Sequence, residues 1–343
     1  RTRDSLGTLS NAIANDLAAA LGTGVRPAQR RAPDPQAYEA YERGRFFFLR
    51  ADPATARTLF QQAILRDSTF APAWAGLARA WGELADTWVA PLMAFPRVRE
   101  AAHRALALDS TIASAYVALC GVAVALDRDW GECLRLAERA VALDSTLPDA
   151  WAQLGFALAA LRRGPEALLA GRHAWALDSL SAYVGLSLLG LTRVVAPERT
   201  PAVLALVRGR LDANYATAWD AWIAIERGDC ATGDRLLRPL SEDHGPGSST
   251  AYAVALACLG RRAEADSVVR AVIADTAGAY VNPVWVAWGL LALDDRDGAI
   301  RWLERGAEER TAWVMWIHLD PDLAPLRGDP RFVALERRLG LEP

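Results

Sequence analysis

Asp67-Ser68-Thr69-Phe70-Ala71-Pro72-Ala73-Trp74 is the stretch that decides the fold, because chemically similar stretches recur after it. In each of them an aromatic residue stands seven positions after the Asp, in the segments Asp109–Tyr116, Asp144–Trp151 and Asp212–Trp219. Asp178 keeps the same interval, since it lies 34 residues after Asp144 and 34 before Asp212. A fixed period of about 34 residues is typical of proteins built from stacked structural repeats.

The small residues within each period indicate what a repeat is made of. In the clearest unit, residues 148–181, the pattern comprises Trp151, Leu154, Gly155, Leu158, Ala167, Gly171, Ala174 and Ser179, at unit positions 4, 7, 8, 11, 20, 24, 27 and 32. This pattern resembles the tetratricopeptide repeat, a pair of helices. Small side chains at positions 8 and 20 let two helix axes approach to about 8–10 Å. A small residue at position 27 lets the next unit nest against the pair.

The repeat units therefore predict an all-α protein. They run from about residue 37 to residue 312 and favour a right-handed α-solenoid of about eight tetratricopeptide-like helix pairs. The unit at residues 71–112 is about eight residues too long, and the surplus lies near Asp86–Pro96. A short final helix, Asp329–Leu339, carries apolar residues on one face and is expected to cap the open end of the stack.

The recurring Asp-Ser-Thr triplets contain hydroxyl and carboxyl groups that are common in nucleophilic sites, but they stand at the junctions between units. We interpret them as structural, because Ser or Thr at such a place can cap the start of the following helix. Thr146 with Asp149 fits a capping box, and Pro148 suits a first helical turn.

The two ends of the chain divide it into four segments. Residues 1–24 are expected to form an amphipathic helix that is a remnant of an upstream domain, and residues 25–36 a Pro/Arg-rich linker. The solenoid occupies 37–312 and a C-terminal cap 313–343. The chain begins with Arg rather than Met and shows no signal-peptide pattern, so we expect a processed or cut-down piece of a longer polypeptide.

Two stretches outside the generic repeat are similar to one bacterial family. One is Ala37-Tyr38-x2-Tyr41-x2-Gly44-Arg45-x-Phe47, and the other runs from Glu308-Glu309-Arg310 through Asp320-Pro321 to Asp329-Pro330-Arg331-Phe332. They resemble the tetratricopeptide C-terminal half of bacterial signalling proteins. The N-terminal halves of these proteins are serine/threonine kinases, adenylate or other nucleotide cyclases or winged-helix regulators, often with a TolB-like middle domain. The resemblance implies a sensing or docking arm, either cytoplasmic or, if an upstream membrane segment tethers it, extracytoplasmic.

Composition argues against several function classes. The net charge is −3 and no basic run appears, so we expect no nucleic-acid partner. All 38 basic residues are Arg, which excludes a Schiff-base Lys and a phosphate-loop Lys. No apolar run reaches about 18 residues, so no membrane insertion is expected within the chain. The four His are far apart in sequence, and we expect no metal, no cofactor and no enzymatic activity.

Four cysteines are present, and two of them are expected to be neighbours. Cys120 and Cys133 fall at unit positions 8 and 20, if one inserted residue is allowed. We favour the interpretation that they are small packing residues. The alternative is a disulfide, which requires an oxidising compartment.

A stack of this kind has a concave surface, and the unit positions that line it supply the candidate binding residues. Aromatic and Arg side chains there are the usual anchors of protein interfaces. The candidate groove residues are Tyr38, Tyr41, Arg45, Arg79, Phe156, Asp220, Arg227 and Trp288. The clamp that binds acidic chaperone tails uses Lys and Asn on this face, and both are missing at the mapped positions.

We therefore expect a non-catalytic protein-interaction module of a bacterial signalling or regulatory protein, which binds a peptide or partner domain in the concave groove. The alternative is a structural role, in which homo-oligomers or a larger coat form through the convex or end surfaces.

Overall fold

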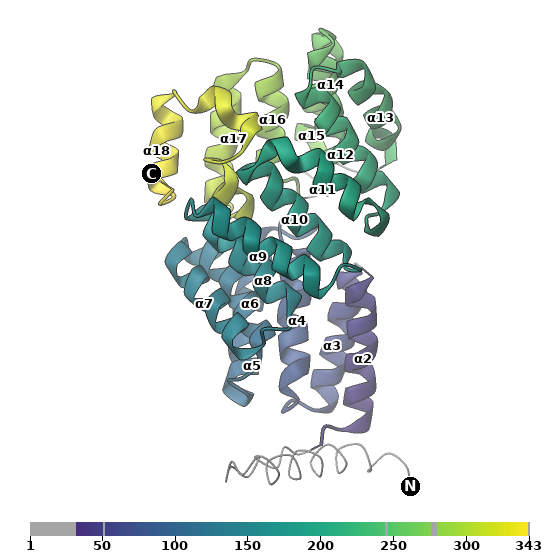
Figure 1. Ribbon diagram of the computed structural model, residues 1–343, viewed down its shortest axis with the longest axis vertical. Helices are drawn as coiled ribbons and strands as arrows, with labels where there is room; N and C mark the ends of the chain where they lie inside the picture. Colours follow the sequence, from purple (N-terminus) through teal and green to yellow (C-terminus); the bar gives the residue numbers. More distant parts are fainter. Residues whose placement is uncertain (1–31, 51, 244–245, 276–279, 342–343) are drawn as a thin grey trace.

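The computed structural model describes residues 32–50, 52–243, 246–275 and 280–341, and within these ranges the chain is a stack of helical pairs (Figure 1). The expected helix at 1–24 lies outside the described residues, as does most of the linker. The paired helices are α2 (Pro35–Leu49) and α3 (Pro53–Arg66), α4 (Ala71–Leu84) and α5 (Pro91–Leu108), α6 (Ala113–Val122) and α7 (Trp130–Leu143), α8 (Pro148–Ala160) and α9 (Gly164–Leu177), α10 (Ala182–Val195) and α11 (Thr200–Val207), α12 (Ala213–Glu226) and α13 (Cys230–Asp243), α14 (Pro246–Cys258) and α15 (Arg262–Asp275), and α16 (Pro283–Ala292) and α17 (Arg296–Glu308). The predicted all-α solenoid of eight tetratricopeptide-like pairs is confirmed for the described part of the chain.

The Asp-Ser-Thr triplets are structural, but not in the way that the sequence suggested. Asp144 is the C-cap of α7, and its carboxylate accepts hydrogen bonds from the amide (2.9 Å) and the hydroxyl (2.7 Å) of Thr146. The indole of Trp151 donates to the carbonyl of Ser145 at 2.9 Å, which explains the seven-residue spacing. The expected capping box of Thr146 with Asp149 does not form, because the N-cap of α8 is Leu147 and makes no side-chain bond.

The same junction recurs at the ends of α3 and α5. Asp67 and Asp109 are the C-caps there, and each accepts from the Thr two positions later. The following aromatic residue again bonds to the Ser carbonyl, at 2.9 Å from Trp74 and at 3.1 Å from Tyr116. The repeat motif is therefore a joint that fixes the second helix of one pair to the first helix of the following pair.

The turn inside most of the pairs also repeats. Arg128, Arg162, Gly228, Gly260 and Asp294 have φ between 56° and 80° and follow the first helices α6 (through its π-helical end), α8, α12, α14 and α16. A left-handed residue at this place is a common way to end a helix. The α6 turn holds one extra residue, which a π-helical turn (Ala123–Asp127) accommodates.

The first helices form the tighter, inner side of the stack. Neighbouring first helices pack directly on one another, from α2 on α4 to α14 on α16 with α10 and α12 as the exception, whereas neighbouring second helices make few or no such contacts. Side chains that point inward from the first helices therefore line the concave face.

After α17, the chain turns back along this inner side. Residues 312–341 contain two 3₁₀ helices, η4 (Ala312–Trp316) and η5 (Pro321–Leu326), and the helix α18 (Pro330–Arg338). α18 contacts α17, but the chain just after it also reaches α7, because the indole of Trp130 donates to the carbonyl of Leu339 at 3.1 Å. The segment therefore does more than cap the end of the stack, as the sequence had suggested. We call residues 312–341 the C-terminal segment.

Candidate functional site

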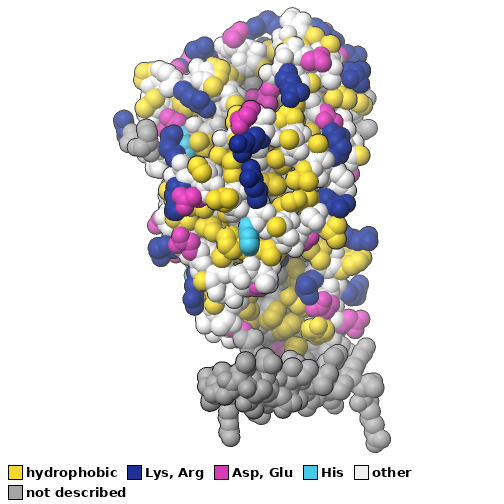
Figure 2. All heavy atoms as spheres, in the orientation of Figure 1, with side chains coloured by type: hydrophobic (Ala, Val, Ile, Leu, Met, Phe, Trp, Pro, Cys, Tyr) yellow, Lys and Arg dark blue, Asp and Glu magenta, His cyan; other side chains and the backbone are white. Residues whose placement is uncertain are grey.

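The first part of the inner face, over α2 and α4, brings four of the predicted groove residues together. Tyr38, Tyr41 and Arg45 lie on one face of α2, and the guanidinium of Arg45 stands 5.9 Å from the ring centre of Tyr41. Tyr41 packs edge-on against Phe70 at 5.1 Å. Tyr38 is 49% exposed, so this aromatic surface is open to solvent. Figure 2 shows a hollow with hydrophobic side chains in the lower half of the molecule, with charged side chains of both signs around it.

Arg79 on α4 connects this surface to later repeats. Its guanidinium lies 4.3 Å from the ring centre of Phe48 and forms an ion pair with Asp149 of α8. Burial lowers the pKa of Arg79, and the nearby Glu83 and Tyr183 oppose that shift. The result is a platform of aromatic rings and guanidinium groups, which suits recognition of a partner.

The later part of the inner face is covered by the C-terminal segment. Phe156 of α8 packs edge-on against Trp316 at 5.3 Å. The indole of Trp288 on α16 donates to a carboxylate oxygen of Asp320 at 2.9 Å. These two predicted groove residues therefore contact the chain itself.

Arg193 of α10 is the main polar contact of that region. It forms ion pairs with Asp322, with Asp320 at 3.4 Å and with Glu226 at 3.2 Å, and it lies over the ring of Trp222 at 5.7 Å. Burial alone would lower the pKa of Arg193, but these carboxylates raise it above its ordinary value. Asp322 makes the largest contribution among them. Burial raises the pKa of Asp320 to about 6, and Asp322 adds to the effect.

Asp86 joins the short loop between α4 and α5 to the C-terminal part of the chain; the surplus expected near Asp86–Pro96 mostly lengthens α5, which has 18 residues. One carboxylate oxygen accepts from the hydroxyl of Tyr280 at 3.0 Å, and the other from the amide of Ala312 at 2.6 Å. Burial raises the pKa of Asp86 to about 6, above the 3.8 of an exposed Asp, and hydrogen bonds including one from Thr311 oppose it. Burial of the ionised carboxylate therefore opposes folding at neutral pH. The stability that the protonated, buried Asp86 contributes is therefore fully present below about pH 4, and it is lost as the pH rises through 6.

Burial shows that the C-terminal segment is part of the core. Ile317, Leu323, Leu326 and Phe332 are each 0% exposed. Full burial of such a side chain contributes about 1.5–3 kcal/mol, so four of them contribute up to about 6–12 kcal/mol. A short peptide with millimolar affinity supplies only about 4 kcal/mol. The C-terminal segment is therefore packed into the core of the stack and closes this part of the groove.

Asp220 and Arg227, the remaining predicted groove residues, lie elsewhere. Both line a separate hollow between α11, α12 and α13. On α12, Trp222 is the side chain that faces Arg193 and Trp288. The helix starts directly after Asp212, which here is an N-cap and not a C-cap, so the expected register does not apply to it.

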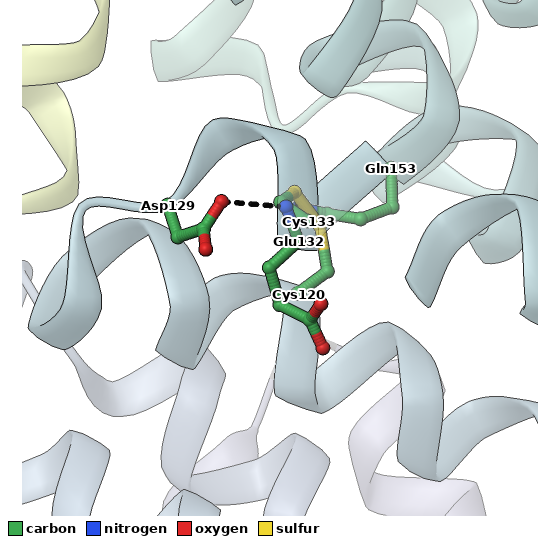
Figure 3. The surroundings of a disulfide bond; sticks show 5 residues. All are labelled: Cys120, Asp129, Glu132, Cys133 and Gln153. Atoms are coloured by element: carbon green, nitrogen blue, oxygen red, sulfur yellow. Dashed lines mark hydrogen bonds between the residues drawn. A yellow bond between two sulfur atoms is a disulfide. The ribbon is translucent and has the colours of Figure 1, made fainter. Parts of the chain in front are cut away.

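All four cysteines of the chain are paired. Cys120 and Cys133 form a buried disulfide between α6 and α7, beside the amide of Gln153 (Figure 3). The favoured interpretation, two packing residues, is therefore wrong. Cys230 and Cys258 form a second disulfide between α13 and α14, which the sequence did not lead us to expect. Cys258 is exposed.

Among the described residues, no three His, Cys, Asp or Glu side chains are grouped so that they could hold a metal ion. No helix in the described ranges combines the length and the apolar character needed to cross a bilayer.

Comparison with known proteins concerns the fold alone. Neither a protein-family model nor a curated protein sequence matches this chain. The solved structure of pilF of Pseudomonas aeruginosa has 18% identity and a TM-score of 0.41, covering 61% of this chain and 92% of that one. A thermophilic TPR protein of Thermus thermophilus has 18% identity and a TM-score of 0.43, over 51% and 91%. The type IV pilus biogenesis factor PilW has 13% identity and a TM-score of 0.45, over 61% and 94%. Likenesses of this size carry no argument about function.

Proposed function

We propose that this chain is a docking module that binds a peptide or a partner domain on the inner face over α2 and α4, without bond chemistry. One observation carries the proposal. Tyr38 and Arg45 at the start of the groove are exposed, with Tyr41 and Arg79 half-buried beside them, while the C-terminal segment covers the part from α8 to α16. The resemblance to signalling proteins suggests that a partner bound here regulates an upstream domain.

Side-chain chemistry supports this location. The side chain of Arg45 is 53% exposed and forms an ion pair with Glu42 of its own helix, at 3.0 Å. An exposed pair of this kind contributes about 0–1 kcal/mol, so Arg45 can exchange Glu42 for a partner's carboxylate at little cost. Tyr38 adds an aromatic contact area with low rotational freedom, which is favourable at interfaces.

The test is a screen of the purified chain against an array of 12-residue peptides. We expect the double variant Tyr38→Ala, Arg45→Glu to lose at least tenfold in affinity for the selected peptides. Arg43→Glu is the matched control, because it makes the same charge change on an exposed position of the same helix. Equal binding by the double variant, or no peptide selected by the wild type, would overturn the proposal.

A second candidate function, self-association, is supported by an exposed apolar patch in the loop between α4 and α5 and the first turn of α5. Trp88, Leu92 and Met93 are 61%, 53% and 55% exposed and lie within six residues. If this patch joins copies of the chain, Trp88→Ser with Leu92→Ser should reduce the mass measured by light scattering. Leu65→Ser on α3, where Leu65 is 85% exposed, is the control. A monomeric wild type at high concentration rejects this candidate.

The disulfides Cys120–Cys133 and Cys230–Cys258 are relevant to the cellular compartment in which the protein works. Disulfides persist in oxidising environments and are rare in the reducing cytosol. Of the two locations that the resemblance allows, we therefore propose the extracytoplasmic side. Thiol alkylation of the protein taken directly from its host, followed by mass spectrometry, tests this; free thiols at all four cysteines would contradict it.

A further inference from the structure

A hollow of about 610 Å³ lies between α11, α12 and α13. It exists because the repeat is irregular there. α11 has 8 residues, whereas the second helices of the other pairs have 13 to 18. A 3₁₀ turn, Arg208–Arg210, follows α11 directly. The shortened helix leaves one face of α12 uncovered, and Figure 1 shows α11, α12 and α13 side by side in this region.

The walls of the hollow carry three Arg and two Asp, but the Asp are already occupied. Asp220 forms an ion pair with Arg208. Asp229 accepts from the amide of Thr232 at 3.1 Å, at the first turn of α13. This bond is the main reason why the pKa of Asp229 is lowered, and Arg235 makes a smaller contribution.

Arg227 and Arg235 are the other two cations of the hollow, and each has a carboxylate in its vicinity that interacts with it through charge, Glu226 for Arg227 and Asp229 for Arg235. Among the described residues, neither guanidinium donates a hydrogen bond or forms a direct ion pair. Both are exposed, and they stand on α13 and at the end of α12, on two walls of the same hollow. Two guanidinium groups in this arrangement suit a carboxylate, which matches the planar geometry of Arg.

The floor of the hollow is apolar. Leu204 and Ile223 are 2% and 9% exposed, and Pro201, Ala205, Ala224 and Leu236 surround them. An apolar floor with two cationic groups at its edge favours a ligand that has both an aliphatic body and an anionic end. A bare inorganic anion would leave the floor unused.

We propose that this hollow is a second binding site, which takes an aliphatic carboxylate held by Arg227 and Arg235. The C-terminal residue of a peptide and a free branched-chain acid both supply this chemistry. The site is independent of the inner face, so it stands even if the groove over α2 and α4 binds nothing.

The test is calorimetric titration of the purified chain at low salt with three probes. These are N-acetyl-leucyl-leucine with a free carboxylate, the same dipeptide as its C-terminal amide, and 4-methylpentanoate. We expect at least one acid to bind in the millimolar range or tighter and the amide to bind at least tenfold more weakly. Binding of the dipeptide acid alone assigns the site to peptide C-termini, and binding of 4-methylpentanoate alone assigns it to free acids.

Variants locate the site. Arg227→Gln with Arg235→Gln should weaken the acid at least tenfold, and Ala205→Phe should do the same by filling the floor without a change of charge. Arg238→Gln, on α13 but outside the hollow, is the matched control and should bind as the wild type does. Far-UV circular dichroism verifies that each variant is folded. Absence of binding by both acids, equal binding of acid and amide, or unchanged binding by the double Arg variant would overturn the proposal.

Discussion

Replacing one Gly by Ala should have opposite effects at two places in the stack. Gly155 lies where α8 crosses α9, and a Cβ atom there would stand 3.1 Å from the carbonyl oxygen of Ala167 and 2.9 Å from a methyl group of Leu191. Gly190 lies inside α10, and a Cβ atom there would meet nothing within 4 Å. The two sites therefore separate helix propensity from packing.

The magnitudes follow from two terms. Ala is better than Gly in a helix interior by about 0.8–1.0 kcal/mol, so Gly190→Ala should stabilise the chain by roughly that amount. Gly155→Ala gains the same term, but overpacking of a backbone contact costs about 1–3 kcal/mol, which gives a net loss of about 0–2 kcal/mol. Gly155→Leu should lose more, because its longer side chain must also displace Leu191.

Equilibrium unfolding in urea, followed by circular dichroism, measures these differences as shifts of the midpoint. We predict that Gly155→Ala is less stable than Gly190→Ala by about 1–3 kcal/mol. Equal stabilisation by both substitutions would refute the reasoning, because it would mean that α8 and α9 do not approach closely at position 155.

Three further predictions concern the contacts that close the fold. Asp86→Asn removes a carboxyl whose pKa is raised to about 6. The stability of the wild type relative to this variant should be about 2 kcal/mol greater near pH 4.5 than near pH 8, as measured by urea unfolding; no change, or a change of opposite sign, would contradict the assignment. Trp130→Phe leaves the carbonyl of Leu339 without its indole donor and should lower stability by about 1–3 kcal/mol in thermal unfolding; an unchanged midpoint would argue against this contact. Dithiothreitol should reduce Cys230–Cys258 before the buried disulfide, because Cys258 is exposed; alkylation and mass spectrometry report the order, and the reverse order would be inconsistent with the packing.

The helix pairs could be predicted from sequence because their signals are local. Gly155, Ala167 and Gly171 meet within one unit, and the aromatic residue seven positions after each Asp marks a joint within one turn of the next helix. The inward side of α12 could not be predicted by the same rule. Asp212 begins that helix instead of ending the one before it, so Trp222, and not Asp220, faces the inner side.

The sequence contains no repeating pattern from which one could predict that the C-terminal segment covers the groove. Arg193 meets Asp322 across 129 residues, and Asp86 meets the amide of Ala312 across 226. No periodicity connects positions so far apart. The sequence does contain Arg193 and an Asp-Pro-Asp near the end of the chain, but their pairing depends on how the whole stack curves.

Cys120 and Cys133 were misinterpreted for a different reason. Their placement at unit positions 8 and 20 correctly predicts neighbouring side chains, but it does not distinguish packing from a bond; a π-helical turn, Ala123–Asp127, lies between them. The second pair joins two different repeat units, so spacing within one unit could not reveal it.

Amide hydrogen exchange of residues 312–327 tests the central claim most directly, because this stretch is the part of the chain that fills the inner face. We predict exchange as slow as that of α8 and α10, limited by unfolding of the whole stack. Exchange within seconds, with α8 and α10 still protected, would show that the groove is empty in solution and would contradict the claim.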